Sequence, residues 1–207
     1  QGYSSAASDV YKRQIQKHGA NITDCLCVTC REQKEHNRLK RKVIRMKLGF
    51  IGTGNMASAI MGGIIKNNVI PAEEIIGADL FAPGRERVQK EYGINVTADN
   101  KEVAQKAETI ILSVKPQFYE SVIADIKDVV TDKQIIITIA PGKTLAWLAE
   151  QFGKDVKIVR TMPNTPAMVG EGMTAVCPNE HLTEDEIAYV KSLLAVSYTH
   201  LTLPTNS

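Results

Sequence analysis

The chain has 207 residues, 43% of them hydrophobic, and its 25 basic and 23 acidic residues leave a formal charge of +2. This length and composition allow a sizeable buried core, so the sequence predicts a globular protein. The basic excess is confined to residues 31–47, so we expect no nucleic-acid partner. No apolar run reaches the length of a membrane helix, and the N-terminus lacks a secretory signal. We therefore expect a cytoplasmic protein without a membrane partner.

The first 45 residues show neither helical nor strand periodicity and end just before Met46, which has the position of a natural initiator. We interpret residues 1–45 as an unstructured or non-native leader, with a genuine disordered tail as the alternative. Three cysteines between residues 25 and 30, with a histidine at 18 or 36, fit no standard zinc spacing. We therefore predict no metal, and a zinc-binding adaptor built on residues 15–45 is the alternative.

The first expected strand, residues 48–51, runs into Gly52-Thr53-Gly54-Asn55-Met56-Ala57, and a helix is expected over residues 56–68. This is a G-x-G-x-x-A turn between a strand and a helix. Its first glycine permits the tight reversal, its second lets the backbone approach a pyrophosphate, and the small Ala57 lets the helix pack close to the sheet. The turn predicts dinucleotide binding.

Further apolar runs predict strands at residues 75–78, 109–114, 134–139 and 157–161. Helix-like stretches lie between or after them, at residues 85–92, 101–106, 118–130 and 144–152. This alternation predicts an α/β fold, a Rossmann-type doubly wound and mostly parallel sheet over residues 46–194. In such a sheet the ligand lies at the carboxyl ends of the strands.

The loop after the second strand leaves the choice of cofactor open. Asp79 stands where a carboxylate reaches the adenosine ribose hydroxyls, which favours NAD. Arg85 and Arg87 follow and could hold a 2′-phosphate, which favours NADP, or could belong to a solvated helix face.

Three further features in the loops are ambiguous from pattern alone. Asn100 could bind a ligand or cap the helix that it begins, and Lys115 could contact a cofactor or be solvated. The prolines of Met162-Pro163-Asn164-Thr165-Pro166 preclude a central strand there and predict a rigid loop. Because His181 is the single histidine of residues 46–194, we expect a reduction whose proton comes from solvent, substrate or a hydroxyl group.

A last helix is expected from a cap at Thr183 to Leu194, after which residues 195–207 break the pattern. We interpret residues 195–207 as a non-native tail.

Five motifs in order make the chain resemble the pyrroline-5-carboxylate reductases. They are GFIGTGNMA at 49–57, TADNK at 97–101, LSVKPQ at 112–117, IAPGKT at 139–144 and RTMPNTPA with VGEG at 160–172. The resemblance implies hydride transfer from NADPH or NADH to the C=N carbon of 1-pyrroline-5-carboxylate, which gives L-proline in the last step of proline biosynthesis.

The resemblance also implies roles for single residues. The pyrophosphate would be bound by Ile51, Gly52, Thr53, Gly54, Asn55 and Met56, and Asn100 would contact the adenosine ribose or phosphate. Val114, Lys115 and Pro116, continued by Ala140, Pro141 and Gly142, would line the ribose and nicotinamide. Met162, Pro163, Asn164 and Thr165 would lie beside the nicotinamide and substrate, with no catalytic residue certain.

The resemblance stops at Leu194, because the family's helical dimerisation domain, with its D-x-x-x-P-G-G-T-T substrate loop, is missing. We therefore expect this chain to bind cofactor with little or no turnover, and the full-length protein to be a homo-oligomer. The alternatives are another oxidoreductase of the superfamily, of the F420-dependent NADP reductase or β-hydroxyacid dehydrogenase type, or a non-catalytic nucleotide-binding relative.

Overall fold

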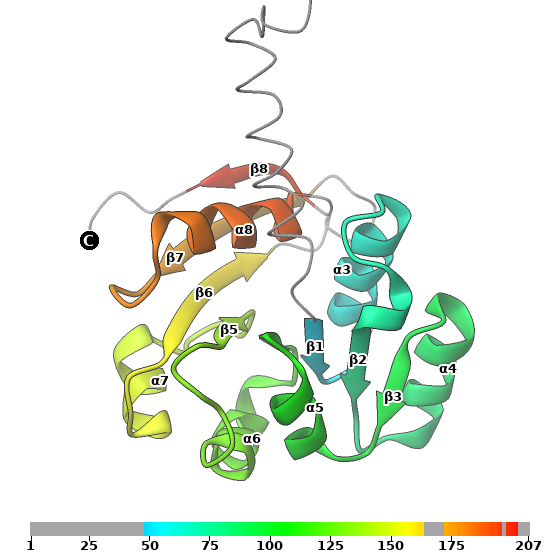
Figure 1. Cartoon of the computed structure of the whole chain (residues 1–207), viewed down its shortest axis with the longest axis horizontal. Coiled ribbons are helices and arrows are strands. Elements are labelled where there is room, and N and C mark those ends of the chain that lie inside the picture. Colours follow the sequence, from blue (N-terminus) through cyan, green and yellow to red (C-terminus); the bar gives the residue numbers. More distant parts are fainter. Residues whose placement is uncertain (1–47, 164–171, 196–197, 203–207) are drawn as a thin grey trace, which may run out of the picture. The chain divides into compact units, whose positions relative to one another are not determined.

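The computed structural model describes residues 48–163, 172–195 and 198–202, which belong to one compact unit of the chain. Residues 1–45, with the leader and zinc interpretations, lie outside the described residues. Within the described part, eight strands form one sheet in the order β3-β2-β1-β4-β5-β6-β7-β8 (Figure 1).

The strands are β1 (Leu48–Ile51), β2 (Ile75–Ala78), β3 (Asn95–Thr97), β4 (Thr109–Leu112), β5 (Ile135–Thr138), β6 (Lys157–Pro163), β7 (Gly172–Pro178) and β8 (Tyr198–Thr202). Strands β1 to β6 are parallel, β7 runs antiparallel to β6, and β8 is parallel to β7. Since β1 pairs with both β2 and β4, the strand order reverses direction between β1 and β4. The expected doubly wound, mostly parallel sheet is confirmed.

The helices are α3 (Asn55–Lys66), α4 (Ala82–Tyr92), α5 (Asn100–Lys106), α6 (Tyr119–Ile126), α7 (Leu145–Phe152) and α8 (Glu184–Leu194), with short 3-10 turns η1 (Ala72–Glu74) and η2 (Pro116–Phe118). One face of the sheet, including Ile51, Leu112 and Ile136, packs in a buried cluster with α5, α6 and α7. Helices α3 and α4 lie on the other face (Figure 1). Right-handed crossovers from both sides of β1 require this division.

Helix caps agree with the sequence in two places and correct it in one. Thr144 accepts a hydrogen bond from the Trp147 N–H, and Thr183 forms a capping box with Glu186, as the pattern predicted. At α5 the cap is Asp99, whose side chain accepts from the Lys101 N–H. The capping interpretation of Asn100 was therefore wrong, and its side chain is available for other contacts.

The structure extends β6 beyond the predicted strand end. Residues 162 and 163 continue β6 and pair with β7, although the prolines led us to expect a loop from Met162. The pairing of β5 ends at Arg160, so the last part of β6 has a partner on one side alone. A proline is tolerated there because its missing N–H can face the unpaired side.

Three strands were not predicted. β3 has three residues, and the pairing of β7 and β8 depends on contacts distant in sequence. The strand β8 lies within residues 195–207, for which the sequence predicted no helix or strand, so that expectation was wrong for Tyr198–Thr202. Their interpretation as a non-native tail stays a prediction.

The absence of a side chain at Gly49 brings α5 against β1. A Cβ at Gly49 would lie 2.5 Å from Cγ1 of Val103 and 2.7 Å from Cβ of Ala107. Both neighbours belong to α5 or its end, and the Cβ of Ala107 has no rotamer by which to move away. The close packing sets the position of the α5 N-terminus at the end of the sheet.

We expect Gly49→Ala to lower the free energy of unfolding by about 1–3 kcal/mol, because the added methyl overpacks this contact. Gly54→Ala is the matched control, since its Cβ would meet no atom within 4 Å. Denaturant unfolding of the two variants checks the difference. Equal stabilities would contradict a tight contact at Gly49.

A partly buried ion pair joins β6 to α8. Lys157 Nζ lies 2.6 Å from Glu186 Oε1, and the two side chains are 22% and 16% exposed. Burial alone would raise the pKa of Glu186, but hydrogen bonds from Lys157 and from the Thr183 N–H outweigh it, and the pKa lies below its usual 4.5. The unfolded chain therefore binds a proton at Glu186 more readily than the folded one.

It follows that the contribution of Glu186 to stability is present above about pH 4.5 and is lost as the pH falls through the lower folded pKa. We expect Glu186→Gln, which keeps an acceptor for Thr183, to be less stable than the parent at neutral pH. Its unfolding free energy should also decline less on acidification. Denaturant midpoints measured across the acidic range check this, and parallel profiles for the two proteins would contradict it.

Candidate functional site

The parallel registers place the ends of five strands at one edge of the sheet. In the strand register, Ile51 is paired with Ala78 on one side and with Leu112 on the other. Thr138 is paired with Leu112 and with Arg160. The loops that follow the first four of these strands therefore start side by side, and β6 continues from Arg160 to Pro163 at the same edge. These are the loops in which the sequence predicted a ligand site.

The turn after β1 is held between its two neighbours. Gly52 has a φ of +97°, and its N–H donates to the Ala78 carbonyl at 2.7 Å. Its own carbonyl accepts from Ser113 Oγ at 2.7 Å. A Cβ at this position would lie 2.8 Å from the carbonyl carbon and oxygen of Ser113, so glycine is required for both conformation and space.

Beyond this turn, the start of α3 faces open space. A Cβ added to Gly54 would meet no atom within 4 Å, and Ala57 is fully buried in the packing role predicted for it. The first helical bond, from the Ser58 N–H, reaches the Gly54 carbonyl, so the N–H groups of residues 55–57 have no acceptor within the helix. Uncovered amides and the positive end of the helix dipole suit a phosphate group, so these residues fit a pyrophosphate.

Asp79 connects the second loop to the first. Its Oδ2 accepts from the N–H of Thr53 at 2.8 Å and from its Oγ1 at 3.0 Å, and its Oδ1 accepts from the Phe81 N–H at 3.0 Å. Thr53 itself is buried. The carboxylate is thereby fixed at the tip of β2, beside the glycine turn.

The two arginines on α4 bond to main-chain carbonyls. Arg85 Nη1 donates to the Asp79 carbonyl, and Arg87 Nη2 donates to the Thr53 carbonyl and to Ser58 Oγ, both at 3.0 Å. Arg87 also lies 3.8 Å from Glu91. The sequence left open whether these arginines are solvated or bind a phosphate, and the structure gives them a bracing role between α4 and the first two loops.

A cleft of about 430 Å³ opens beside these loops, which we call the Asp79 cleft. Four predicted site residues line it, namely Gly52, Asp79, Asn100 and Val114. It is also lined by Ala78, Leu80, Phe81, Phe118, Ser121, Val122 and Asp125. Leu80, Phe81 and Phe118 are 84%, 66% and 50% exposed, which leaves an apolar rim that a flat base could cover.

The lining residues from η2 and α6 were missed by sequence reasoning. The rule that ligands lie at the carboxyl ends of strands predicts contacts in loops alone, whereas Ser121, Val122 and Asp125 lie within a helix. The available signal was Phe118, an apolar aromatic placed directly after a strand-end loop.

Helices α5 and α6 are tied together at the Asp79 cleft. Asn100 Nδ2 donates to Asp125 Oδ2 at 3.2 Å, and Lys101 Nζ lies 3.7 Å from Asp125 Oδ1. The hydroxyl of Tyr119 donates to the Leu112 carbonyl, and burial raises its pKa to about 12. Tyr119 therefore stays protonated and anchors α6 to the tip of β4.

The other predicted residues that the structure describes lie at the same sheet edge but do not line the Asp79 cleft. Lys115 precedes η2 and Pro116 begins it, Ala140 to Gly142 follow β5, and Met162 and Pro163 end β6. Asn164 and Thr165 lie outside the described residues. His181 Nε2 is 3.8 Å from Asp155 Oδ1, just before β6 begins, and so lies away from this edge.

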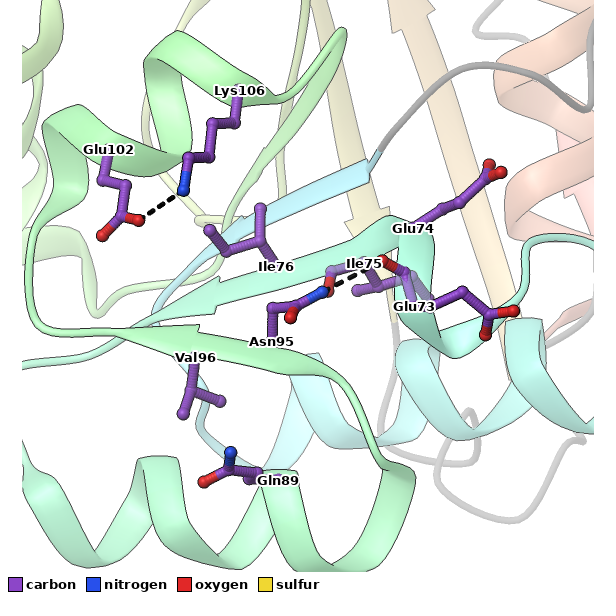
Figure 2. Close-up of a pocket in the computed structure, with 9 residues that line it drawn as sticks. All are labelled: Glu73, Glu74, Ile75, Ile76, Gln89, Asn95, Val96, Glu102 and Lys106. Atoms are coloured by element: carbon purple, nitrogen blue, oxygen red, sulfur yellow. Dashed lines mark hydrogen bonds and ion pairs between the residues drawn. The ribbon is translucent and has the colours of Figure 1, made fainter.

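A larger hollow of about 580 Å³ lies elsewhere on the domain (Figure 2). Its lining includes Ile75 and Asn95, which begin β2 and β3, so it is at the opposite end of these strands from the glycine turn. On α5, at one side of the hollow, Lys106 pairs with Glu102 at 2.6 Å, and Asn95 donates to the Glu73 carbonyl at 3.0 Å. None of the predicted site residues lines it.

Within the ranges that the structure describes, no cluster of three or more metal-binding side chains occurs. The described helices also include none that is both long and apolar enough to cross a membrane.

Comparison with known proteins agrees with a dinucleotide site. Residues 47–142 match a family model described as NADP oxidoreductase, coenzyme F420-dependent. Over 151 residues the chain is 39% identical to a pyrroline-5-carboxylate reductase of Escherichia coli, a match that covers 71% of this chain and 55% of the relative.

Solved structures give the same result. A pyrroline-5-carboxylate reductase from Coxiella burnetii superposes with a TM-score of 0.74 at 29% identity. A pyrroline carboxylate reductase from Plasmodium falciparum, solved with NADP bound, superposes with a TM-score of 0.69 at 30% identity. Each match covers 78% of this chain, and 60% and 58% of the respective relatives. The chain thus spans less than two thirds of the length of these relatives.

We expect Gly52→Ala to destabilise the protein by more than about 2 kcal/mol, because it adds a main-chain clash to the strain of a positive φ. Gly142→Ala is the matched control, since its φ is +76° but its Cβ would meet nothing within 4 Å. Gly142→Ala should lower the free energy of unfolding by about 1 kcal/mol, which is the cost of the positive φ alone. Denaturant unfolding measures both, and similar losses would contradict the close approach of Ser113.

Proposed function

Because its dinucleotide-binding domain is related to that of the pyrroline-5-carboxylate reductases, we propose that this protein reduces 1-pyrroline-5-carboxylate to L-proline with NADPH or NADH. The supporting observation is the 39% identity over 151 residues, which extends well beyond the glycine turn. A shared nucleotide-binding turn alone would not account for a match of that length.

The glycine turn and the start of α3 supply the pyrophosphate site. Gly54 leaves space for the ligand, and the amides of residues 55–57 present donors to it. Asp79 and Asn100, on neighbouring loops that open to the Asp79 cleft, are assigned to the adenosine end. These residues orient the dinucleotide and fix the direction in which its other end extends.

The other end extends along the tips of β4, β5 and β6. We assign the loop from Val114 to Pro116 and the loop from Ala140 to Gly142 to the nicotinamide side. Met162 and Pro163 would lie beside the substrate, and Asn164 and Thr165 are assigned with them from the sequence. The bound dinucleotide supplies a hydride to the carbon of a protonated C=N bond. The chain needs mainly to hold the dinucleotide and the substrate in the correct relative position, and this task requires no histidine. The one histidine of residues 46–194, His181, lies away from these loops.

The family model gives a reason to keep a second candidate. Its description names coenzyme F420-dependent NADP oxidoreductases, although the model matches residues 47–142 alone. An enzyme of that type would use the same pyrophosphate and adenosine residues with a different partner for the hydride.

The wider setting is proposed on the same basis. We propose a cytoplasmic protein with no nucleic-acid partner, whose full-length form is a homo-oligomer in which a further helical domain completes the substrate site.

We expect calorimetry on the folded 207-residue chain to detect binding of at least one pyridine nucleotide. Adding 1-pyrroline-5-carboxylate should oxidise the reduced nucleotide slowly, as followed by nicotinamide absorbance. Gly54→Ala places a methyl group where the pyrophosphate would lie and should weaken nucleotide binding by roughly tenfold or more, with little loss of stability.

Two results would count against the proposal. If the folded chain takes up neither nucleotide, the dinucleotide site itself is refuted. If nucleotide binds but is oxidised by F420 and not by 1-pyrroline-5-carboxylate, the second candidate replaces the first.

A further inference from the structure

We propose that this protein uses NADH in preference to NADPH, and that Asp79 sets the preference. The proposal rests on the proposed function, because it concerns the adenosine end of the same dinucleotide. There NADH carries a 2′-hydroxyl and NADPH a 2′-phosphate. The preference differs from the NADP in the description of the family model and in the Plasmodium falciparum structure.

Asp79 lines the cleft, and its carboxylate has the capacity to accept one more hydrogen bond. It already accepts three, two from Thr53 at 2.8 and 3.0 Å and one from the Phe81 N–H at 3.0 Å. An ionised carboxylate has about four acceptor sites, so one remains for a ribose hydroxyl. A phosphate offers mainly acceptor oxygens and negative charge, and cannot replace the hydroxyl in this bond.

The charge of the Asp79 cleft favours the same nucleotide. Its charged lining residues are Asp79 and Asp125, both acidic, and among the described residues no lysine or arginine lines it. A 2′-phosphate entering the cleft would approach two carboxylates, of which Asp125 is paired with Lys101 and Asp79 forms no ion pair with a described residue. Like charges a few ångströms apart at a protein surface repel measurably.

The nearby cations are engaged elsewhere. Arg85 donates to the Asp79 carbonyl, and one nitrogen of Arg87 donates to both Thr53 and Ser58 at 3.0 Å. Lys101 is paired with Asp125 at 3.7 Å. Strong phosphate binding by arginine depends on a guanidinium fork that faces the phosphate. Turning Arg87 into the cleft would break its bonds to Thr53 and Ser58, and turning Arg85 would break its bond to the Asp79 carbonyl.

The decisive measurement is the ratio of the dissociation constants of NADPH and NADH, obtained by calorimetry on the full chain at low salt. We expect NADH to bind at least about tenfold more tightly. The ratio should shrink as salt is added, because part of the discrimination is charge repulsion. Equal or tighter binding of NADPH would overturn the proposal, whereas failure to bind either nucleotide would refute the proposed function instead.

Asp79→Asn tests the residue itself. It keeps the size of the side chain and an acceptor for Thr53, but removes the charge. We expect NADH to bind several-fold more weakly and NADPH several-fold more tightly than in the parent. Asp132→Asn removes an equal charge from an exposed turn outside the cleft and should leave the ratio unchanged. An unchanged ratio in folded Asp79→Asn would overturn the role of Asp79, and the ratio in the parent chain tests the preference even if the variant does not fold.

Discussion

The contact of bare main chain at Gly52 with the tips of β2 and β4 is the constraint on which the rest of the site depends. Its N–H is bonded to Ala78 on one side, and its carbonyl accepts from Ser113 on the other. With strands about 4.8 Å apart, a side chain between them has no room. The turn is therefore rigid, and the direction in which α3 starts follows from it.

From this turn the constraint passes to the neighbouring loops through hydrogen bonds. Thr53 lies one residue further on and holds the Asp79 carboxylate, while Arg87 holds the Thr53 carbonyl from α4. On the opposite face, Gly49 lets α5 approach β1, and Asn100 at the start of that helix bonds to Asp125 on α6. The Asp79 cleft is thus formed by groups whose positions are set by packing on both faces of the sheet.

The same hydrogen bonds bear on the proposed selectivity for NADH over NADPH. Groups that would otherwise attract a phosphate are engaged in holding the main chain, and the charged groups left facing the Asp79 cleft are carboxylates. In the proposed binding mode, a pyrophosphate and a 2′-phosphate would be treated differently as a result. The first would meet the helix amides of residues 55–57, and the second would meet Asp79.

Much of the fold and part of the site were predictable because they depend on local pattern. Apolar runs of four residues between helical segments specify buried parallel strands, and G-x-G-x-x-A specifies the turn. The strands β1, β2, β4 and β5, the start of β6 and the glycine turn therefore followed from the sequence. Asp79 was also placed correctly at a strand end.

The tertiary structure alone decided which partners each side chain contacts. The bonds of Arg85 and Arg87, the partnership of Asn100 with Asp125, the lining from α6 and the extension of β6 through Pro163 all join residues distant in the chain. Such pairs leave no periodic signal, because they depend on which faces meet once the sheet has formed.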